Sequence, residues 1–356
     1  MTVLAHPALP LLALASMALS WAVPFGAAMA VLCALLLLAS VFAAVHHAEL
    51  VAHRVGEPYG TLVLALAITV IEVALILSLM LAGGAGTATL PRDTLFATVM
   101  IICSGVVGLC ILVGGMRHRE QSFQIAGTGP ALAALVVLCG LVLVLPVYTT
   151  SSPAATYTRA QLVFAGLAAL ATWAVFVFVQ TVRHRDYFLP PDTPSDESAH
   201  AVPPSTARAW LSLGLLLVCL AAVVGLAKRL SPGIEALLDS AGAPKAVVGI
   251  IIAMLVLLPE TVAAVRAAGA NRLQTSMNLA LGSAMASIGL TVPAVVAAAM
   301  WLDLPLMLGL SPKDQALLLM TFMVCAITLG SGRTHLMQGA VHLVLFAAYL
   351  FLAFVP

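Results

Sequence analysis

Residues 56–80 read GEPYGTLVLALAITVIEVALILSLM, and this stretch decides the fold of the chain. A turn signal at residues 56–60 is followed by an apolar run from Leu62 to Ala82, in which Glu72 is the one ionised group. About 20 apolar residues cross the hydrocarbon layer of a membrane as a helix. A carboxylate near the middle of such a helix costs roughly 2.5–3.5 kcal/mol on insertion scales, so Glu72 is predicted to face a cavity or a partner and to be functional.

A second stretch, residues 244–267, repeats this arrangement as PKAVVGIIIAMLVLLPETVAAVRA. Its one carboxylate is Glu260, and Pro259 directly precedes it. Two long apolar helices in separate halves of the chain, each with one buried glutamate, indicate a transporter built from two similar halves.

The composition indicates an integral membrane protein. Of the 356 residues 62% are hydrophobic and 8% are charged, and the mean hydropathy is +1.13. Soluble domains carry about 25% charged residues. The net charge of +1, without a long basic run, gives no reason to expect a nucleic-acid partner. The six cysteines all lie in apolar runs without a CxxC pair, which predicts packing rather than a disulfide framework or a zinc site.

The apolar runs predict about eleven transmembrane helices in an all-α bundle, because they are long and do not alternate with polar residues. The predicted spans are 8–23, 25–45, 60–82, 94–116, 129–147, 160–182, 209–227, 244–267, 274–300, 312–330 and 336–355. Residues 183–208 differ, since they contain five prolines with several acids and serines and predict a linker.

The linker divides the spans into two sets of five after one extra helix, and the glutamate helix comes second in each set. Because five is odd, the two sets enter the membrane from opposite sides, which is the plan of inverted repeats with a site at the midplane. The predicted organisation is an extra N-terminal transmembrane helix at 1–24, repeats at 25–182 and 209–356, and a linker at 183–208. The distribution of Lys and Arg predicts that the N-terminus and the linker are cytoplasmic and the C-terminus is outside.

The two glutamates suggest how ions would be exchanged. A carboxylate in a low-dielectric cavity resists being charged unless a cation neutralises it, so a proton and a cation compete for it. Hard cations such as Ca²⁺ prefer oxygen ligands, including carboxylates. Glu72 and Glu260 are therefore the candidate cation and proton ligands, and the alternative is a structural pair of protonated glutamates.

Five further residues are candidate supporting ligands: Thr69, Ser104, Pro259, Asn278 and Ser283. Thr69 lies three residues before Glu72, on the same helical face. Pro259 frees a backbone carbonyl that could bind a cation, or it simply kinks the helix. The Thr69 hydroxyl could equally bond to a carbonyl one turn earlier, and Ser283 could bond to its own helix.

Histidines form two further candidate groups. His46, His47, Glu49 and His53 could sense pH or bind metal, although such a group more often is the solvated end of a helix. His335 and His342 lie seven residues apart, where packing is favoured over a proton relay.

The sequence contains no HExxH, GxSxG or phosphate-loop motif, so an enzyme is not expected and transport should use an ion gradient. No cofactor is expected, and inorganic cations and protons are the predicted partners, with the lipid bilayer around the chain. The alternative is a cation channel, or an exchanger that is not coupled to protons. One glutamate per half forms no carboxylate ring, which disfavours the channel.

At these residues the chain resembles the calcium/cation–proton exchanger family, within the cation/calcium exchanger superfamily. It is most similar to bacterial inner-membrane sodium-potassium/calcium–proton antiporters. Glu72 and Glu260 fall on the glutamates of the two family repeats, and residues 280–283 (ALGS) followed by Val292-Pro293 resemble another family stretch. The resemblance implies that both glutamates bind Ca²⁺, Na⁺ or K⁺ as substrate and exchange it for protons in the inner membrane.

The chain departs from the family pattern beside both glutamates. Thr69 and Leu257 stand where the motif has asparagine, and Thr261 stands where a histidine follows the second glutamate. Fewer polar ligands remain than in a dedicated calcium site, so Na⁺ and K⁺ join Ca²⁺ as predicted substrates.

Overall fold

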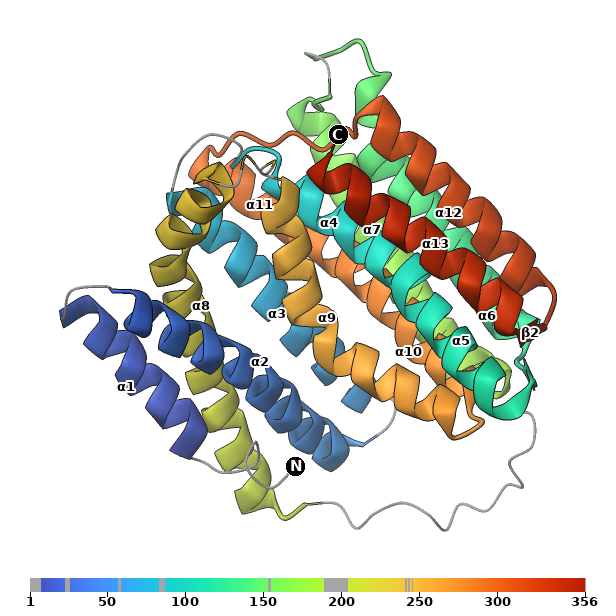
Figure 1. Cartoon of the computed structure of the whole chain (residues 1–356), viewed down its shortest axis with the longest axis horizontal. Coiled ribbons are helices and arrows are strands. Elements are labelled where there is room, and N and C mark those ends of the chain that lie inside the picture. Colours follow the sequence, from blue (N-terminus) through green and yellow to red (C-terminus); the bar gives the residue numbers. More distant parts are fainter. Residues whose placement is uncertain are drawn as a thin grey trace. The chain divides into compact units, whose positions relative to one another are not determined.

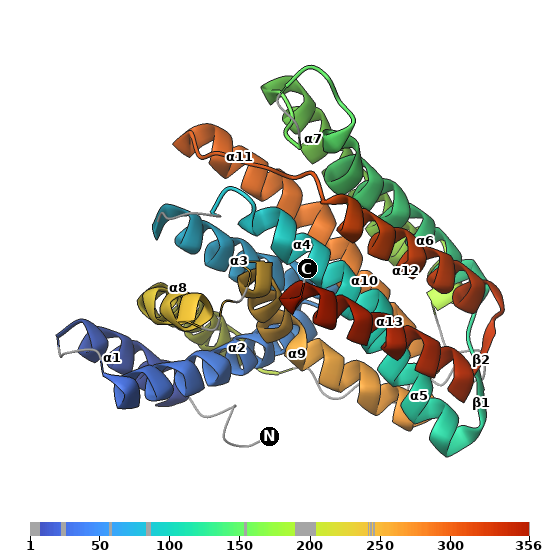
Figure 2. The ribbon, with the colours of Figure 1, turned by 45° about the horizontal axis from the view of Figure 1, so that its top comes forward.

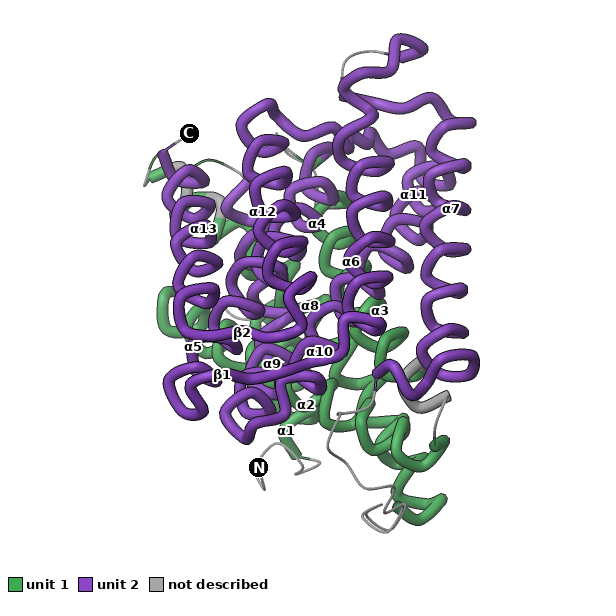
Figure 3. Tube along the Cα trace, turned by 90° about the vertical axis from the view of Figure 1, so that its right-hand side faces the viewer, with its two compact units in different colours: residues 1–87, 196–245 green, residues 88–195, 246–356 purple. Residues whose placement is uncertain are grey.

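The computed structural model describes residues 8–22, 26–56, 59–82, 87–152, 155–188, 204–240, 242, 244 and 246–355, and nearly all of them are helical. Residues 57 and 58 of the turn signal, residues 23–25 between the first two predicted spans, and residues 189–203 of the predicted linker lie outside this description. The chain forms two compact units, residues 1–87 with 196–245 and residues 88–195 with 246–356 (Figure 3). Each unit takes helices from both halves of the sequence.

Unit 1 contains four described helices, α1 (Ala8–Ala22), α2 (Ala27–Val55), α3 (Tyr59–Ala82) and α8 (Thr206–Ser240). The helix α2 packs along α8, and α1 and α3 each contact both of them (Figure 1). The helix α2 is longer than the predicted run at 25–45, because residues 46–55, which mix polar and apolar side chains, continue the helix. Gly56 ends it with a φ of +77°, a conformation that favours glycine.

Ten helical segments in the described residues are long and apolar enough to cross a membrane, and α1 is shorter. Its 15 residues rise about 22 Å at 1.5 Å per residue, whereas the hydrocarbon core is about 30 Å thick. The predicted class, an all-α membrane protein with about eleven helical segments, is confirmed. The extra N-terminal helix is present but is shorter than a standard span.

Unit 2 holds the other helical segments and two short strands. In chain order they are α4 (Leu90–Met100), η1 (Ile101–Val106), α5 (Val107–His118), β1 (Glu120–Ser122), α6 (Ile125–Cys139), η2 (Gly140–Val144), η3 (Leu145–Val147), α7 (Arg159–Phe178), η4 (Val179–Arg183), η5 (Arg185–Phe188), α9 (Ala246–Gly269), α10 (Leu273–Ala286), η7 (Ser287–Thr291), α11 (Val292–Leu302), α12 (Pro312–Gly330), β2 (Arg333–His335) and α13 (Leu336–Phe354).

Two long segments of unit 2 are each interrupted by a π-helical turn, and they run in opposite directions. The segment α4–η1–α5 begins where Met307 N, beyond α11, donates to Ala88 O at 2.9 Å. It ends where Gln121 Nε2 donates to Ala268 O, just before α10, at 3.0 Å. The segment α10–η7–α11 therefore runs the opposite way beside it, as inverted repeats require (Figures 1 and 2).

The two strands were not predicted. Strand β1 follows α5 and pairs antiparallel with β2, which precedes α13, and Gln121 lies opposite Thr334. Both of these residues are buried. The pair joins the α5–α6 turn to the α12–α13 turn at one end of unit 2.

The predicted linker at 183–208 is also shorter in the structure than expected from its composition. Its first residues form η5, and Phe188 is buried with its ring 6.1 Å from that of Phe176. Its last residues, from Thr206, already belong to α8.

Candidate functional site

The helix α9 changes direction near its middle, where Pro259 lies (Figure 1). Proline has no N–H to donate to the carbonyl four residues earlier, which is that of Leu255, and its ring pushes the helix aside. Glu260 follows immediately and is half-buried. The bend therefore places a carboxylate next to irregular backbone inside a membrane-spanning helix.

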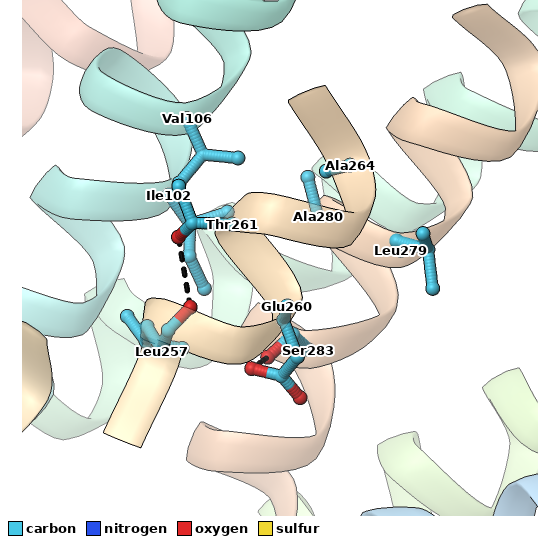
Figure 4. A pocket seen from close by; sticks show the side chains of 9 residues that line it. All are labelled: Ile102, Val106, Leu257, Glu260, Thr261, Ala264, Leu279, Ala280 and Ser283. Carbon is cyan, nitrogen blue, oxygen red and sulfur yellow. Dashed lines mark hydrogen bonds between the residues drawn. The ribbon is translucent and has the colours of Figure 1, made fainter. Parts of the chain in front are cut away.

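Glu260 lines a small pocket together with residues of α9, α10 and η1. The lining residues are Ile102, Val106, Leu257, Glu260, Thr261, Ala264, Leu279, Ala280 and Ser283 (Figure 4). Ser283 Oγ donates to Glu260 Oε2 at 3.1 Å. The part of this cavity that a water-sized sphere can enter is about 10 Å³, and one water needs about 10–15 Å³ by this measure, so the pocket has room for about one water or one dehydrated cation.

The two oxygen-bearing side chains that meet here suit the binding of a cation or a proton. The Ser283 hydroxyl holds one carboxylate oxygen of Glu260, and hydroxyl lone pairs remain available to a cation. The third polar side chain of the pocket is directed elsewhere, because Thr261 Oγ1 donates to Leu257 O at 2.8 Å. The rest of the wall is apolar, which raises the cost of leaving a carboxylate charged and uncompensated.

Glu72 lies in unit 1, on α3, where it is 3% exposed. Thr69 is 5% exposed one helical turn before it. The helix α3 packs against α2 and α8 within the same unit. Glu72 is thus a carboxylate buried inside a membrane-spanning helix, as its position in the sequence predicts.

Two of the predicted supporting ligands use their polar groups away from the pocket. Ser104 Oγ donates to Met100 O of its own helix. Asn278 Nδ2 donates to Phe188 O at 2.5 Å, and its Oδ1 accepts from Gln274 Nε2 at 2.8 Å. The structure brings Pro259 and Ser283 to Glu260 and places the side chains of Ser104 and Asn278 elsewhere.

The histidine cluster lies in the last turns of α2, where Glu49 and His53 are exposed and His46 and His47 are not. His47 is 2% exposed, and its ring centroid is 5.7 Å from that of His46. His53 is exposed near the end of α2. The interpretation as a solvated helix end therefore holds for Glu49 and His53, and the burial of His47 was not predicted.

A third buried carboxylate, which the sequence reasoning missed, opens α4. Asp93 is 9% exposed, and it accepts from Arg92 Nε at 2.8 Å and from Thr89 Oγ1 at 3.0 Å. Arg92 also donates to Gly309 O at 3.1 Å. The adjacent Arg–Asp pair at the edge of an apolar run was the available signal. The pair satisfies its charges locally, which is typical of a structural anchor.

Comparison with known proteins gives the family. A model of the sodium/calcium exchanger protein family matches residues 25–182 and 211–355. The "Putative ionic transporter y4hA" of Sinorhizobium fredii is 50% identical over 325 residues, covering 90% of this chain and 87% of that protein. The sodium-potassium/proton antiporter ChaA of Escherichia coli is 36% identical over 356 residues, covering 99% and 96%.

A solved structure supports the fold. The crystal structure of the H⁺/Ca²⁺ exchanger CAX superposes with a TM-score of 0.69 at 16% identity, covering 96% of this chain and 86% of that one. The family model matches most of the sequence, and the alignment to ChaA is long. This multi-span membrane protein therefore belongs to the sodium/calcium exchanger protein family.

Proposed function

We propose that this chain is a secondary active antiporter that exports Na⁺, K⁺ or Ca²⁺ across the bacterial inner membrane in exchange for H⁺. Glu260, in its pocket beside the Ser283 hydroxyl, is the observation that carries the proposal. When protonated, the carboxyl group is neutral and stable in apolar surroundings. When ionised, it needs a cation nearby, so the pocket holds one or the other.

Glu72 is proposed to be the second carboxylate that binds a cation and a proton in turn. Glu72 is the glutamate of the first half that corresponds to Glu260, and it is buried. Each of the two glutamates lies on the second helix of its repeat. Each carboxyl group is neutral with a proton bound and is compensated by one positive charge when ionised, so one proton replaces one positive charge at each glutamate without net charge in the membrane. The predicted orientation, with the N-terminus in the cytoplasm, belongs to the same proposal.

Two observations favour Na⁺ or K⁺ over Ca²⁺. Ca²⁺ takes six to eight oxygen ligands, and the described residues contain no group of three or more His, Cys, Asp or Glu that could hold a metal ion. The ChaA antiporter, which is 36% identical over 356 residues, is named for sodium and potassium. We therefore propose monovalent cations as the main substrates, with Ca²⁺ transported less well.

Everted membrane vesicles containing the protein test this proposal. A pH gradient is imposed, and NaCl, KCl, CaCl₂ or choline chloride is added while a pH-sensitive dye reports the proton gradient. We expect NaCl or KCl to dissipate the gradient, CaCl₂ to do so less, and choline chloride to match vesicles without the protein. Unchanged dye fluorescence with all three metal salts would refute antiport.

Replacing Ser283 by alanine should weaken cation binding with little effect on the maximal rate. The substitution removes the hydroxyl that lies 3.1 Å from Glu260 Oε2 and leaves the carboxylate in place. A hydrogen bond to a charged group contributes about 1.5–3 kcal/mol, so we expect the half-saturating cation concentration to rise about tenfold. Ser152→Ala is the matched control, because Ser152 Oγ donates to Thr156 O outside the pocket. Equal half-saturation in both variants would remove Ser283 from the site.

A further inference from the structure

The π-helical turn η1 releases one backbone carbonyl from its usual partner. In an α-helix the N–H of Val107 would donate to the carbonyl of Cys103, four residues earlier. In this structure the N–H of Val107 donates to the carbonyls of Ile102 and Ser104. The Cys103 carbonyl therefore needs another donor, because every residue of η1 is buried and an unpaired buried carbonyl is costly.

Side chains of the last two helices supply these donors. His342 Nδ1, on α13, lies 2.8 Å from Cys103 O, and Cys325 Sγ, on α12, donates to the same oxygen at 3.4 Å. A carbonyl only accepts, so Nδ1 of His342 carries the hydrogen. His342 Nε2 lies 3.1 Å from Thr328 Oγ1 and accepts from this hydroxyl in the neutral ring. His342 is fully buried, and its ring is held at both nitrogens.

The same turn forms part of the wall of the Glu260 pocket. Ile102 precedes Cys103 in η1 and lines that pocket together with Val106. Glycines on η1 and α5 allow α13 to approach this wall from behind. A Cβ atom at Gly105 would lie 3.3 Å from the ring of Phe346, and one at Gly108 would lie 2.8 Å from Cβ of His342. The turn η1 therefore forms part of the pocket wall and also packs against α13.

We propose that His342 is a positioning residue for the Glu260 site, because it holds the released Cys103 carbonyl and so keeps η1 in its π-helical form. Without this bond, η1 can revert to a regular α-helical ladder. That change rotates the following turn and moves Ile102 and Val106, so the shape of the pocket changes. The inference rests on the proposed function of Glu260 as the cation and proton ligand, and it assigns to α13 a part in setting cation affinity.

Two substitutions separate the hydrogen bond from the volume of the ring. His342→Leu removes both ring nitrogens, whereas His342→Asn keeps a side-chain N–H at the position of Nδ1. In the full-length detergent-solubilised protein, we measure hydrogen exchange of the amides of residues 101–108. In vesicles, we measure the half-saturating cation concentration and the maximal rate, using whichever of Na⁺, K⁺ or Ca²⁺ gives the largest signal.

For His342→Leu we expect exchange of these amides to be about tenfold faster and the half-saturating concentration to be about tenfold higher. A factor of ten corresponds to about 1.4 kcal/mol, which is within the range for one hydrogen bond. His342→Asn should stay within about threefold of the wild type in both measurements. The maximal rate should change less than the half-saturating concentration, because the carboxyl group of Glu260 that binds the transported ions is unaltered.

Thr328→Val serves as a second variant should His342→Leu fail to fold, since it removes the hydroxyl that orients the ring and keeps a similar shape. It should speed exchange in residues 101–108 by about threefold. His53→Leu is the control, because His53 is exposed in the other unit. Unchanged exchange in His342→Leu and Thr328→Val would overturn the proposal, and so would equal defects in His342→Leu and His342→Asn.

The exchange measurement does not depend on transport. If Glu260→Gln retained full transport, the proposed function would fail, and the exchange data would still show whether His342 holds η1. Faster exchange together with an unchanged half-saturating concentration would overturn the link between η1 and the pocket while leaving cation/proton antiport intact.

Discussion

Glu260→Gln is expected to abolish cation-dependent proton movement in vesicles, with a loss of about 100-fold or more. Glutamine preserves the size of the side chain and can still accept a hydrogen bond from Ser283. It cannot lose a proton, and it offers a cation a neutral oxygen in place of a charged one. Removing one member of a buried charge pair costs about 2–5 kcal/mol, and each 1.4 kcal/mol is a factor of ten.

Glu72→Gln should cause a loss of the same order, because the proposal gives both glutamates a part in the same exchange of cation for proton. The double variant should then be no worse than either single one, since residues that act as a unit are strongly non-additive. Glu120→Gln is the matched control, because Glu120 lies on β1 and is exposed, with its Oε1 3.8 Å from Arg333. All variants are compared at equal protein levels in the membrane.

Two outcomes would contradict this mechanism. Full transport in Glu260→Gln would show that the pocket beside Ser283 does not carry the ions. Full transport in Glu72→Gln with loss in Glu260→Gln would leave a mechanism with one carboxylate, and the predicted role of Glu72 would be wrong. Losses that add in the double variant would indicate two separate sites.

Most of the fold could be predicted because a membrane-spanning helix requires an apolar run of a certain minimum length in the sequence. The predicted span 312–330 coincides with α12, and the predicted span 336–355 is within one residue of α13. Errors occur where a helix continues beyond its apolar part. The predicted span ended at residue 45, before the charged and histidine residues of 46–54, but helical hydrogen bonding continues through them to Gly56.

The parts of the site that could not be predicted depend on backbone detail and on distant contacts. The interruption at η1 follows no proline, so the sequence gives no sign that the Cys103 carbonyl is released. One of its donors, His342, lies 239 residues away, and the sequence favoured a packed histidine over a proton relay there. Ser283 was predicted as a supporting residue on the basis of its type, and only the structure distinguishes it from Asn278, whose amide is bonded to Phe188.

The pairing of β1 with β2 was missed for the same kind of reason. Each strand has three residues, too few to show the alternation of polar and apolar side chains that indicates a strand. Their pairing joins residues more than 200 positions apart, such as Gln121 and Thr334. Short elements of this kind are determined by the helices that bring them together.

Gly339→Ala is expected to lower the free energy of unfolding by about 1–3 kcal/mol, the usual cost of forcing extra atoms into a packed interior. The helices α13 and α5 lie side by side (Figures 1 and 2). A Cβ atom at Gly339 would lie 2.6 Å from Leu112 N and 2.9 Å from Gly108 O. Both are backbone atoms, so no side-chain rotation relieves the overlap and the two helices must separate. Close approach of this kind through small residues is how membrane helices gain packing without a hydrophobic driving force between them.

Gly330→Ala provides the control for this prediction, because a Cβ atom there would meet nothing within 4 Å. Alanine favours a helix over glycine by about 0.8–1 kcal/mol, so this variant should be as stable as the wild type or more so. The measurement is the midpoint of unfolding of each purified protein in the same detergent, by heat or by added SDS. A Gly339→Ala midpoint equal to that of Gly330→Ala would show that α5 and α13 tolerate separation. The contact between Gly108 and His342 depends on the same close approach of α5 and α13. In that case the packing that holds His342 against η1 would contribute little to the stability of unit 2.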